Sequence, residues 1–567
     1  MSLVLAAPVP AAAPAPVVSE KMLQGLVVGV LLVALVVAIV LPVGALLVRS
    51  LFDAQGGYAG LANFSLYLST PALAESAWRS LRLAGLSAAI CVAIAYGYAY
   101  ALTLSAMRFQ AFFRGVALLP LLAPSLLMAI SLVYLFGNQG LLKGLMGGAT
   151  IYGEAGIVAG SVLWTLPHAL LVLTTALATT DARLYEAAQT LGASRWRVLL
   201  TVTLPASRYG LLMAFVVVFV LVLTDFGVPK VVGGQANVLA TDLYKQVVGQ
   251  QNFRMGAVVG VVLLIPAVLA FFVERHLRRR QSAALTVRAA PYTAAPHAAT
   301  DTVLLLFCAL VAGALLVVIG VAVFASLASY WPYNLAPSLK NYDFDNMDGG
   351  GWRTYGNSLL LASAAALVGT ALAFATAWVV DKPRHHPVLR ETLNLLATLP
   401  LAVPGLALGV GYILFFNAPG NPLNGLYATV GILVLCTVVH FLSVAHLTVL
   451  AALRQLDREY ELVGESLGVP FWRTALRVHV PVCLPALIDV AGYFFVNAMT
   501  TVSAVVFLYA PHTQLASVAV LNMDDAGDVA PAAAMAVLIF VSAGVARLAF
   551  AGASRAVLVR TQRWRQR

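Results

Sequence analysis

EAAQTLGASRWRVLLTVTLP, residues 186–205, is a polar segment in a chain built otherwise of long apolar runs. It holds a carboxylate, two arginines, a tryptophan, a glycine near its middle and a closing proline. A related segment, ELVGESLGVPFWRTALRVHVP, occupies residues 461–481. Alignment without a gap pairs Gly192 with Gly468, Trp196 with Trp472, and Pro205 with Pro481. Two copies in register indicate two homologous halves in which the polar segment has the same task.

The repeat extends upstream of the polar segments. LLPLLAP (118–124) matches ATLPLAVP (397–404), so that two prolines recur at the same spacing. The apolar run that starts at Ser80 likewise matches the run that starts at Ser358. Each half is therefore a copy of one membrane unit.

The composition excludes a soluble protein. Of the 567 residues, 61% are hydrophobic and 10% are charged, and the mean hydropathy is +0.91, whereas about a quarter of a soluble chain is charged. A spanning helix needs about 20 apolar residues. We expect an all-α integral membrane protein with about 12 spans, near residues 24–48, 80–104, 114–136, 156–179, 208–226, 255–274, 302–326, 357–380, 392–416, 427–452, 484–509 and 531–552.

Composition shifts divide the chain into five parts. We expect a disordered N-terminal tail (1–23), a first half (24–274), a basic and then Ala/Pro-rich linker (275–301), a second half (302–552) and a basic tail (553–567). An even number of spans puts both termini on one side of the membrane. The loops on the linker side are the richer in arginine, which predicts that this side, with both polar segments and both termini, is cytoplasmic.

Other site classes find no support in the sequence. The four cysteines lie in or beside apolar runs without the spacing of a zinc site or a disulfide frame, so no metal is expected. The net charge of +11 comes from arginines in short loops and not from one basic face, so no nucleic acid is expected. No catalytic residue is predicted, because there is no metalloprotease motif and no nucleophile–base arrangement.

The polar segment predicts a helical elbow. The stretch from Tyr185 holds good helix formers with an acid near its start, and Gly192 permits a tight turn. The next residues can form a short amphipathic helix with Trp196 as an interfacial anchor. Pro205 can open the following span, because the first helical turn does not use its missing N–H.

This elbow resembles the EAA loop of the permease subunits of binding-protein-dependent ABC importers, whose pattern is E-A-A, three residues, G, nine residues, an aliphatic residue, any residue, L and P. The first copy matches throughout. In the second copy the glycine, the aliphatic residue and the proline fit, but Leu462-Val463-Gly464 replaces E-A-A, the acids move to Glu461 and Glu465, and Val480 replaces the leucine.

The resemblance implies the type I ABC importer permease fold, with two homologous six-span halves in a bacterial inner membrane. It also implies an external substrate-binding protein and a dimer of ABC ATPase subunits on the cytoplasmic side. That dimer would carry the ATP and Mg²⁺, since this chain has no phosphate-binding loop, binds no cofactor and is not an enzyme. The residues expected to dock the ATPase are Glu186, Ala187, Ala188, Gly192, Arg195, Trp196, Arg197, Glu461, Glu465, Gly468, Phe471, Trp472 and Arg473.

The fusion of both halves resembles the ferric-iron, thiamine and 2-aminoethylphosphonate importers, and the stretches 224–253 and 500–536 look most like the last. We therefore expect 2-aminoethylphosphonate as cargo, with ferric iron or thiamine as alternatives. The paired span ends after the elbows predict a polar gate at Thr224, Asp225, Thr500, Thr501 and Ser503.

The sequence also allows alternative interpretations of the gate residues, of the elbows and of the transporter class. The gate residues can equally be ordinary helix caps. An elbow can be a basic loop resting on anionic lipid. Two similar halves of six spans also suit an ion-coupled secondary transporter, although few protonatable groups lie at span depth and that class does not explain the elbows.

Overall fold

The computed structural model describes residues 20–284, 292 and 294–561, apart from the single positions 54, 348 and 384. The first half contains helices α1 (Glu20–Leu35), α2 (Leu41–Ser50), α3 (Ala62–Ser69), α4 (Pro71–Thr103), α5 (Gln110–Leu118), α6 (Ser125–Phe136), α7 (Glu154–Ala178), α8 (Ala182–Thr190), α9 (Arg195–Val198), α10 (Leu204–Thr224), α11 (Gly227–Val232), α12 (Leu239–Tyr244) and α13 (Phe253–Ala284).

The second half repeats this order. Its elements are α14 (Ala298–Leu327), strands β1 (Ala328–Tyr330) and β2 (Asn334–Pro337), α15 (Gly351–Asp381), α16 (Pro387–Thr398), α17 (Gly405–Phe416), α18 (Val430–Arg454), α19 (Glu459–Ser466), α20 (Phe471–Thr474), α21 (Val480–Thr500), α22 (Ala516–Ala526) and α23 (Val529–Thr561). The predicted all-α membrane fold is confirmed, with one short antiparallel hairpin added after α14.

In the part of the chain that the structure describes, ten of the twelve predicted spans are single helices long and apolar enough to cross a membrane. The predicted spans at 114–136 and 392–416 are present as apolar helix pairs, which are bent by 103° between α5 and α6 and by 112° between α16 and α17. Proline causes both bends. Pro124 and Pro404 force the residue before them into an extended conformation, with ψ of 140° at Ala123 and 113° at Val403.

Several predicted boundaries shift. Helix α1 begins at Glu20, so residues 20–23 of the expected tail are helical, while residues 1–19 lie outside the described residues. Helix α13 runs to Ala284 and α14 starts at Ala298, so helix occupies both ends of the expected linker. Helix α23 continues to Thr561 through most of the expected tail, whereas α21 stops at Thr500 and not near 509.

The two halves exchange their first spans. Helices α1 and α2 pack on α16 and α17 of the second half, whereas α14 packs on α4, α5 and α6 of the first half. At one crossing the Tyr412 hydroxyl donates to the Ala38 carbonyl at 2.8 Å. At another, a Cβ on Gly411 would lie 2.6 Å from the Pro42 carbonyl oxygen, so only glycine fits there. The halves are therefore interlocked and do not merely touch.

The same hydrogen bonds recur in both halves. The Asn63 amide donates to the carbonyls of Ser50 and Phe52, and the Asn341 amide donates to those of Ser326 and Ala328. The repeat read from the elbows thus holds for the loops on the opposite side of the molecule.

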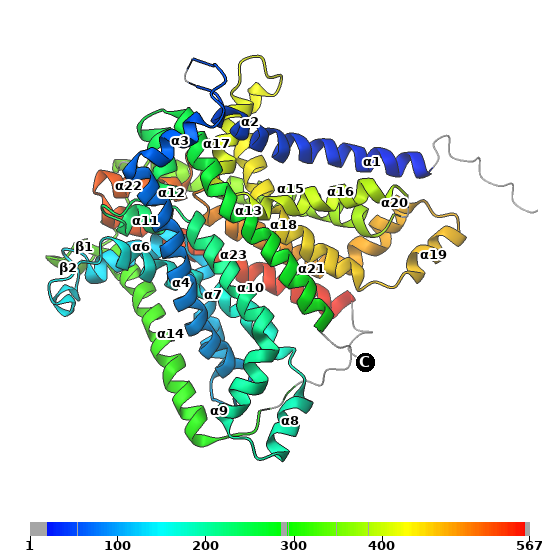
Figure 1. Cartoon of the computed structure of the whole chain (residues 1–567), viewed down its shortest axis with the longest axis horizontal. Helices are drawn as coiled ribbons and strands as arrows, with labels where there is room; N and C mark the ends of the chain where they lie inside the picture. Colours follow the sequence, from blue (N-terminus) through cyan, green and yellow to red (C-terminus); the bar gives the residue numbers. More distant parts are fainter. Residues whose placement is uncertain are drawn as a thin grey trace, which may run out of the picture.

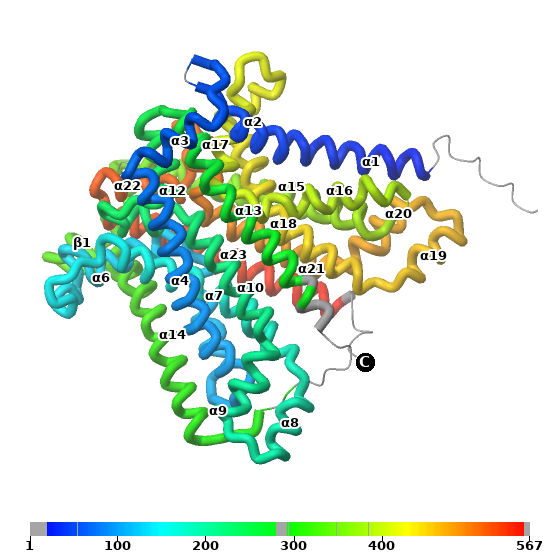
Figure 2. Tube along the Cα trace, in the orientation of Figure 1, coloured from blue at the N-terminus to red at the C-terminus, as the bar shows by residue number. Residues whose placement is uncertain are grey.

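Figure 1 shows two helical arms that diverge. Helices α4, α7, α10 and α14 run toward α8 and α9, while α1, α15, α16, α18 and α21 run toward α19 and α20. We call residues 182–203 elbow 1 and residues 459–479 elbow 2. The elbows lie at the free ends of the two arms (Figure 2). Helix α1 starts near elbow 2, on the side of the molecule where the elbows lie.

A serine on α4 and one on α15 anchor the short helices opposite the elbows. The N–H of Leu239, which opens α12, donates to Ser80 Oγ at 2.7 Å, and the N–H of Ala516, which opens α22, donates to Ser358 Oγ at 2.8 Å. Ser80→Ala or Ser358→Ala leaves a buried N–H without its acceptor. We expect each change to lower the free energy of unfolding by about 1–3 kcal/mol.

Thermal unfolding in detergent measures this effect. The control is Ser87→Ala on α4, a buried serine whose hydroxyl has no hydrogen-bond partner among the described residues. Equal losses for Ser87 and Ser80 would contradict the anchoring role.

Candidate functional site

Elbow 1 is built from two capped helices and a glycine turn. The Asp181 carboxylate accepts the N–H of Arg183 at 3.1 Å and caps α8. Gly192 then takes φ +67°, a left-handed conformation that favours glycine. The Ser194 hydroxyl accepts the N–H of Arg197 at 3.4 Å and caps α9, which continues through a π-helical turn (Leu199–Thr203) into α10. The elbow is thus rigidly joined to a span.

Elbow 1 has a packed underside and an uncovered outer face. Tyr185 and Ala188 are buried, whereas Glu186, Ala187, Arg195 and Arg197 are exposed. Four large apolar side chains of elbow 1 are exposed: Leu191 at 85%, Trp196 at 75%, Leu200 at 60% and Leu184 at 51%. An apolar surface rimmed by charges, at the end of an arm, is typical of a protein docking site.

Elbow 2 has the same shape with different chemistry. Gly468 has φ +65°, and a π-helical turn (Ala475–His479) again joins the short helix to the span. Phe471 stacks on Trp378 of α15, with ring centres 5.6 Å apart and ring planes 12° from parallel. Trp472 is 44% exposed, and the Arg473 guanidinium lies 5.1 Å from its ring centre. Of these two rings, Trp472 is therefore exposed, while Phe471 packs elbow 2 against α15.

Each elbow is hydrogen-bonded to the first span of the opposite half. The Arg195 guanidinium donates to Thr300 Oγ1 of α14 at 2.5 Å. The N–H of Phe471 donates to Glu20 Oε1 of α1 at 3.3 Å. The repeat pairs Arg195 with Phe471, so the two contacts are related even though the side chains differ. Movement of one elbow is thereby connected to both halves.

The displaced acid of elbow 2 points inward. Glu461 Oε1 lies 2.9 Å from Lys382 Nζ and 3.1 Å from His479 Nε2. The side chains of Lys382 and Glu461 are only 6% and 16% exposed. The Trp378 indole N–H donates to His479 Nδ1 at 3.0 Å, so the imidazole proton lies on Nε2 and faces Glu461. We call Trp378, Lys382, Glu461 and His479 the elbow 2 clamp.

Within the described residues, elbow 1 has no such clamp. Tyr100, Leu104, Tyr185 and Thr203 occupy the repeat-related positions, and Tyr185 packs on Tyr292 with ring centres 4.6 Å apart. The sequence carried one sign of the clamp, an acid displaced by one position from E-A-A. The partners Trp378 and Lys382 were missed, because they lie on a distant span. Glu465, the other displaced acid, is exposed.

The five predicted gate residues lie at the paired breaks after α10 and α21. Asp225 accepts Ser125 Oγ at 2.8 Å and the N–H of Val228 at 2.9 Å, which ties the start of α11 to α6. Thr224 and Thr500 donate to carbonyls of their own helices, and the Thr501 carbonyl accepts from Ser517 Oγ at 2.6 Å. A cargo role for the five residues stays a prediction, and the side chains of Thr224, Asp225 and Thr500 already have structural partners.

Ser503 lies in close contact with a glycine at the bend of the broken span. The first half has the same contact, but there the serine is on the broken span and the glycine is on the segment that follows α10. A Cβ on Gly405 would lie 2.8 Å from Ser503 Oγ, and a Cβ on Gly227 would lie 2.3 Å from Ser125 Oγ. In each half a serine meets a glycine at the bend of the broken span, from opposite sides. Tight packing at both bends suits a covered break in a membrane.

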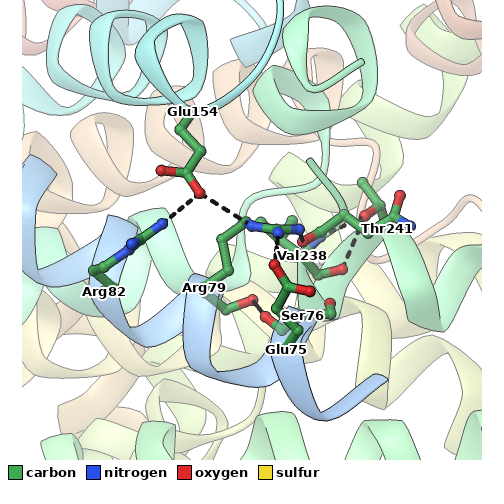
Figure 3. Close-up of polar contacts among 9 residues, drawn as sticks. Glu75, Ser76, Arg79, Arg82, Glu154, Val238 and Thr241 are labelled. Atoms are coloured by element: carbon green, nitrogen blue, oxygen red, sulfur yellow. Dashed lines mark hydrogen bonds and ion pairs between the residues drawn. The ribbon is translucent and has the colours of Figure 1, made fainter. Parts of the chain in front are cut away.

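Ion pairs hold the side opposite the elbows. Figure 3 shows Arg79 and Arg82 of α4 on the Glu154 carboxylate of α7, with Arg79 also bound to Glu75. Across the halves, Lys230 of α11 lies 2.8 Å from Asp525 of α22. Burial, with a smaller contribution from Asp525, raises the pKa of the neighbouring Asp524 to about 6. This side is therefore closed by charged contacts while the elbow arms diverge.

Comparison with known proteins identifies the family. The model of the binding-protein-dependent transport system inner membrane component matches residues 93–283 and 369–555, one copy in each half. The chain belongs to this family. The two matched ranges correspond to the two copies of the internal repeat.

The relatives include ferric and phosphonate permeases. A putative ferric transport system permease protein of Haemophilus influenzae is 29% identical over 70% of this chain and 64% of its own length. A ferric transport system permease protein of Actinobacillus pleuropneumoniae is 27% identical over 77% and 65%. The match thus spans just under two thirds of these two relatives. A putative 2-aminoethylphosphonate permease of Salmonella paratyphi A is 24% identical over 39% of this chain and 82% of its own.

The elbow 2 clamp predicts how substitutions change the free energy of opening elbow 2. Glu461→Gln removes the nearer carboxylate of the buried Lys382 ammonium and leaves it only Asp381, at 3.5 Å. We expect the free energy of opening elbow 2 to fall by about 1–3 kcal/mol. Trypsin cleavage after Arg458, which lies just before α19, should accelerate accordingly. The double change Lys382→Met with Glu461→Gln removes both charges and should recover part of the protection.

Glu459→Gln is the matched control, because Glu459 lies on the same helix but is exposed. A cleavage rate for Glu461→Gln no higher than that of this control would show that the clamp does not hold the elbow.

Proposed function

We propose that this chain is the permease subunit of a binding-protein-dependent ABC importer. The observation that carries the proposal is the pair of elbows, each joined to a span, tied to the other half and uncovered on its outer face. Two related docking faces suit the two related subunits of an ATPase dimer. Closure of that dimer would move the elbows together, and the spans would follow as rigid bodies. ATP and Mg²⁺ belong to the ATPase and not to this chain.

The elbow side is the cytoplasmic side in this proposal. Arginine is concentrated there, in the linker, in the elbows and near the end of α23, which follows the positive-inside rule. Both termini then lie in the cytoplasm, and the opposite face, with α3, α12, α22 and the hairpin, meets an external substrate-binding protein. Membership of an inner membrane family supports a bacterial cytoplasmic membrane.

Ferric iron is the cargo that the relatives favour. The ferric permeases match 70 and 77% of this chain, whereas the phosphonate permease matches 39%. The second candidate is 2-aminoethylphosphonate, favoured by that relative and by the resemblance of segments 224–253 and 500–536. Selectivity in such systems rests largely on the binding protein, and the chain adds to it only what its own path provides.

Uptake into proteoliposomes decides between the cargoes. The chain is reconstituted with its cognate ATPase, ATP is enclosed, and the cognate binding protein is added outside with radioactive ferric iron or with labelled 2-aminoethylphosphonate. We expect ATP-dependent accumulation of ferric iron. Accumulation of the phosphonate alone would transfer the assignment to the second candidate, and ion-gradient-driven uptake without ATP would overturn the importer.

The glycine turns predict how the ATPase binds. A β-branched side chain is strained at φ near +65°, whereas asparagine tolerates this conformation. A Cβ at either glycine would meet no atom within 4 Å, so the strain arises from the backbone alone. We expect Gly192→Val with Gly468→Val to tilt α9 and α20 and to weaken copurification of the ATPase about tenfold or more, at about 1–2 kcal/mol per site.

Gly192→Asn with Gly468→Asn is the matched control and should retain the ATPase. Intact assembly and uptake in the double valine variant would contradict docking at the elbows.

A further inference from the structure

A cavity of about 660 Å³ lies on the elbow side of the second half, where Arg278 of the first half borders it. It is lined by Arg278 of α13 from the first half and by residues of α18, α21 and α23 from the second, among them Thr448, Asp489 and Ser554. The cavity lies on the elbow side, which is the side where the proposed importer would release its cargo.

Asp489 is an acidic residue of the cavity lining that forms no ion pair with any of the described residues. Its Oδ2 accepts a hydrogen bond from Ser554 Oγ at 3.3 Å, and Ser554 also donates to the Pro485 carbonyl at 3.2 Å. No lysine, arginine or histidine of the described part of the chain lies within ion-pair distance of Asp489. The other charged lining residue, Arg278, pairs with Glu274. A shared serine proton is a weak partner for a carboxylate.

The depth of Asp489 makes this charge unusual. It lies nine residues after Val480, the first residue of α21, which is about 14 Å along the helix at 1.5 Å per residue. A carboxylate at span depth is costly and marks a functional position by default. The cost is tolerated here because the side chain faces a cavity and not the hydrocarbon.

The repeat shows that the charge is not required by the fold. Met213 of α10 occupies the position in the first half that Asp489 occupies in the second. The architecture therefore forms equally well with an apolar side chain there. An acidic residue occurs at this position in the second half only. The anchoring serine, in contrast, is present in both halves, as Ser80 and as Ser358.

We infer that Asp489 is a cargo contact that selects for positive charge as the cargo leaves through this cavity. The inference rests on the proposed importer function and adds a substrate class to it. The Asp489 carboxylate attracts a ferric ion and the ammonium group of 2-aminoethylphosphonate, whereas it repels an oxyanion that carries no positive group. A single carboxylate binds weakly enough for release, as a transport path requires.

The charge of the cavity can be measured without any cargo. Thr448 is exposed on the cavity wall, so Thr448→Cys places a reporter thiol there once Cys483, which lines the same wall, is replaced by alanine. The three remaining native cysteines are fully buried. We compare the reaction rates of the introduced thiol with a cationic and an anionic methanethiosulfonate reagent of similar size, in the full-length chain at low salt.

We expect the ratio of cationic to anionic rate to fall about fivefold or more when Asp489→Asn is added, because a nearby charge acts oppositely on the two reagents. An unchanged ratio would overturn the inference, since Asp489 would then not govern the potential of the cavity. This readout is independent of the importer assignment.

Uptake tests whether cargo meets the charge. In the reconstituted importer, with ferric iron or 2-aminoethylphosphonate on the binding protein, we expect Asp489→Asn to lower the uptake rate about tenfold and Asp489→Glu to retain most of it. ATPase activity stimulated by the binding protein should stay within twofold, which shows that assembly is intact. Met213→Asn, at the related position, is the matched control and should change neither quantity.

The outcomes separate the two proposals. Normal uptake in Asp489→Asn, even with a changed reagent ratio, places the cavity off the cargo path and overturns the inference. Failure of the unaltered chain to carry either cargo contradicts the proposed function alone, while the reagent ratio still judges the charge of the cavity.

Discussion

A backbone group that loses its helical partner inside a bilayer must find another within the protein, and this constraint organises the molecule. The chain breaks one span in each half, at Pro124 and at Pro404, and other elements pack closely on both bends. At the bend of α5 and α6 a serine meets a glycine, and the exchanged pair does so at the bend of α16 and α17. Asp225 caps the start of α11, and Ser80 and Ser358 cap α12 and α22.

The interlock of the halves follows from the same requirement. A broken span presents more polar backbone than a straight one and needs a neighbour on each side. The exchanged spans α1 with α2, and α14, supply that neighbour, because each packs on the broken span of the opposite half. The exchange also gives each elbow a contact to the other half, through Thr300 on one side and Glu20 on the other. The exchanged first spans therefore both cover the broken spans and connect each elbow to the opposite half.

Much of this could be read from the sequence because it is local or periodic. Apolar runs indicated the spans, and the registered glycines and prolines indicated the repeat and both elbows. The sharp bends were missed, since a proline within an apolar run fits both a kinked helix and a full break, and only covering side chains decide between them. The clamp was also missed, because Lys382 and Glu461 lie on separate elements far apart in the chain and no local pattern joins them. The gate residues stay a prediction: they lie at the breaks after α10 and α21, where Thr224, Asp225 and Thr500 bond to the backbone.

The two halves share one architecture and differ in where they place charge. Elbow 1 keeps the complete motif and exposes its tryptophan and arginines, while elbow 2 has turned its acid inward to meet Lys382 and His479. The same arm carries Asp489, where the first half has Met213. In a dimer of identical subunits, any such charge would appear twice and face itself across the axis. Fusion of the halves removes that constraint, because each position is encoded separately. The second arm can then carry buried and cavity-facing charges at positions where the first keeps apolar or hydroxyl side chains, without any change in the backbone that both inherit.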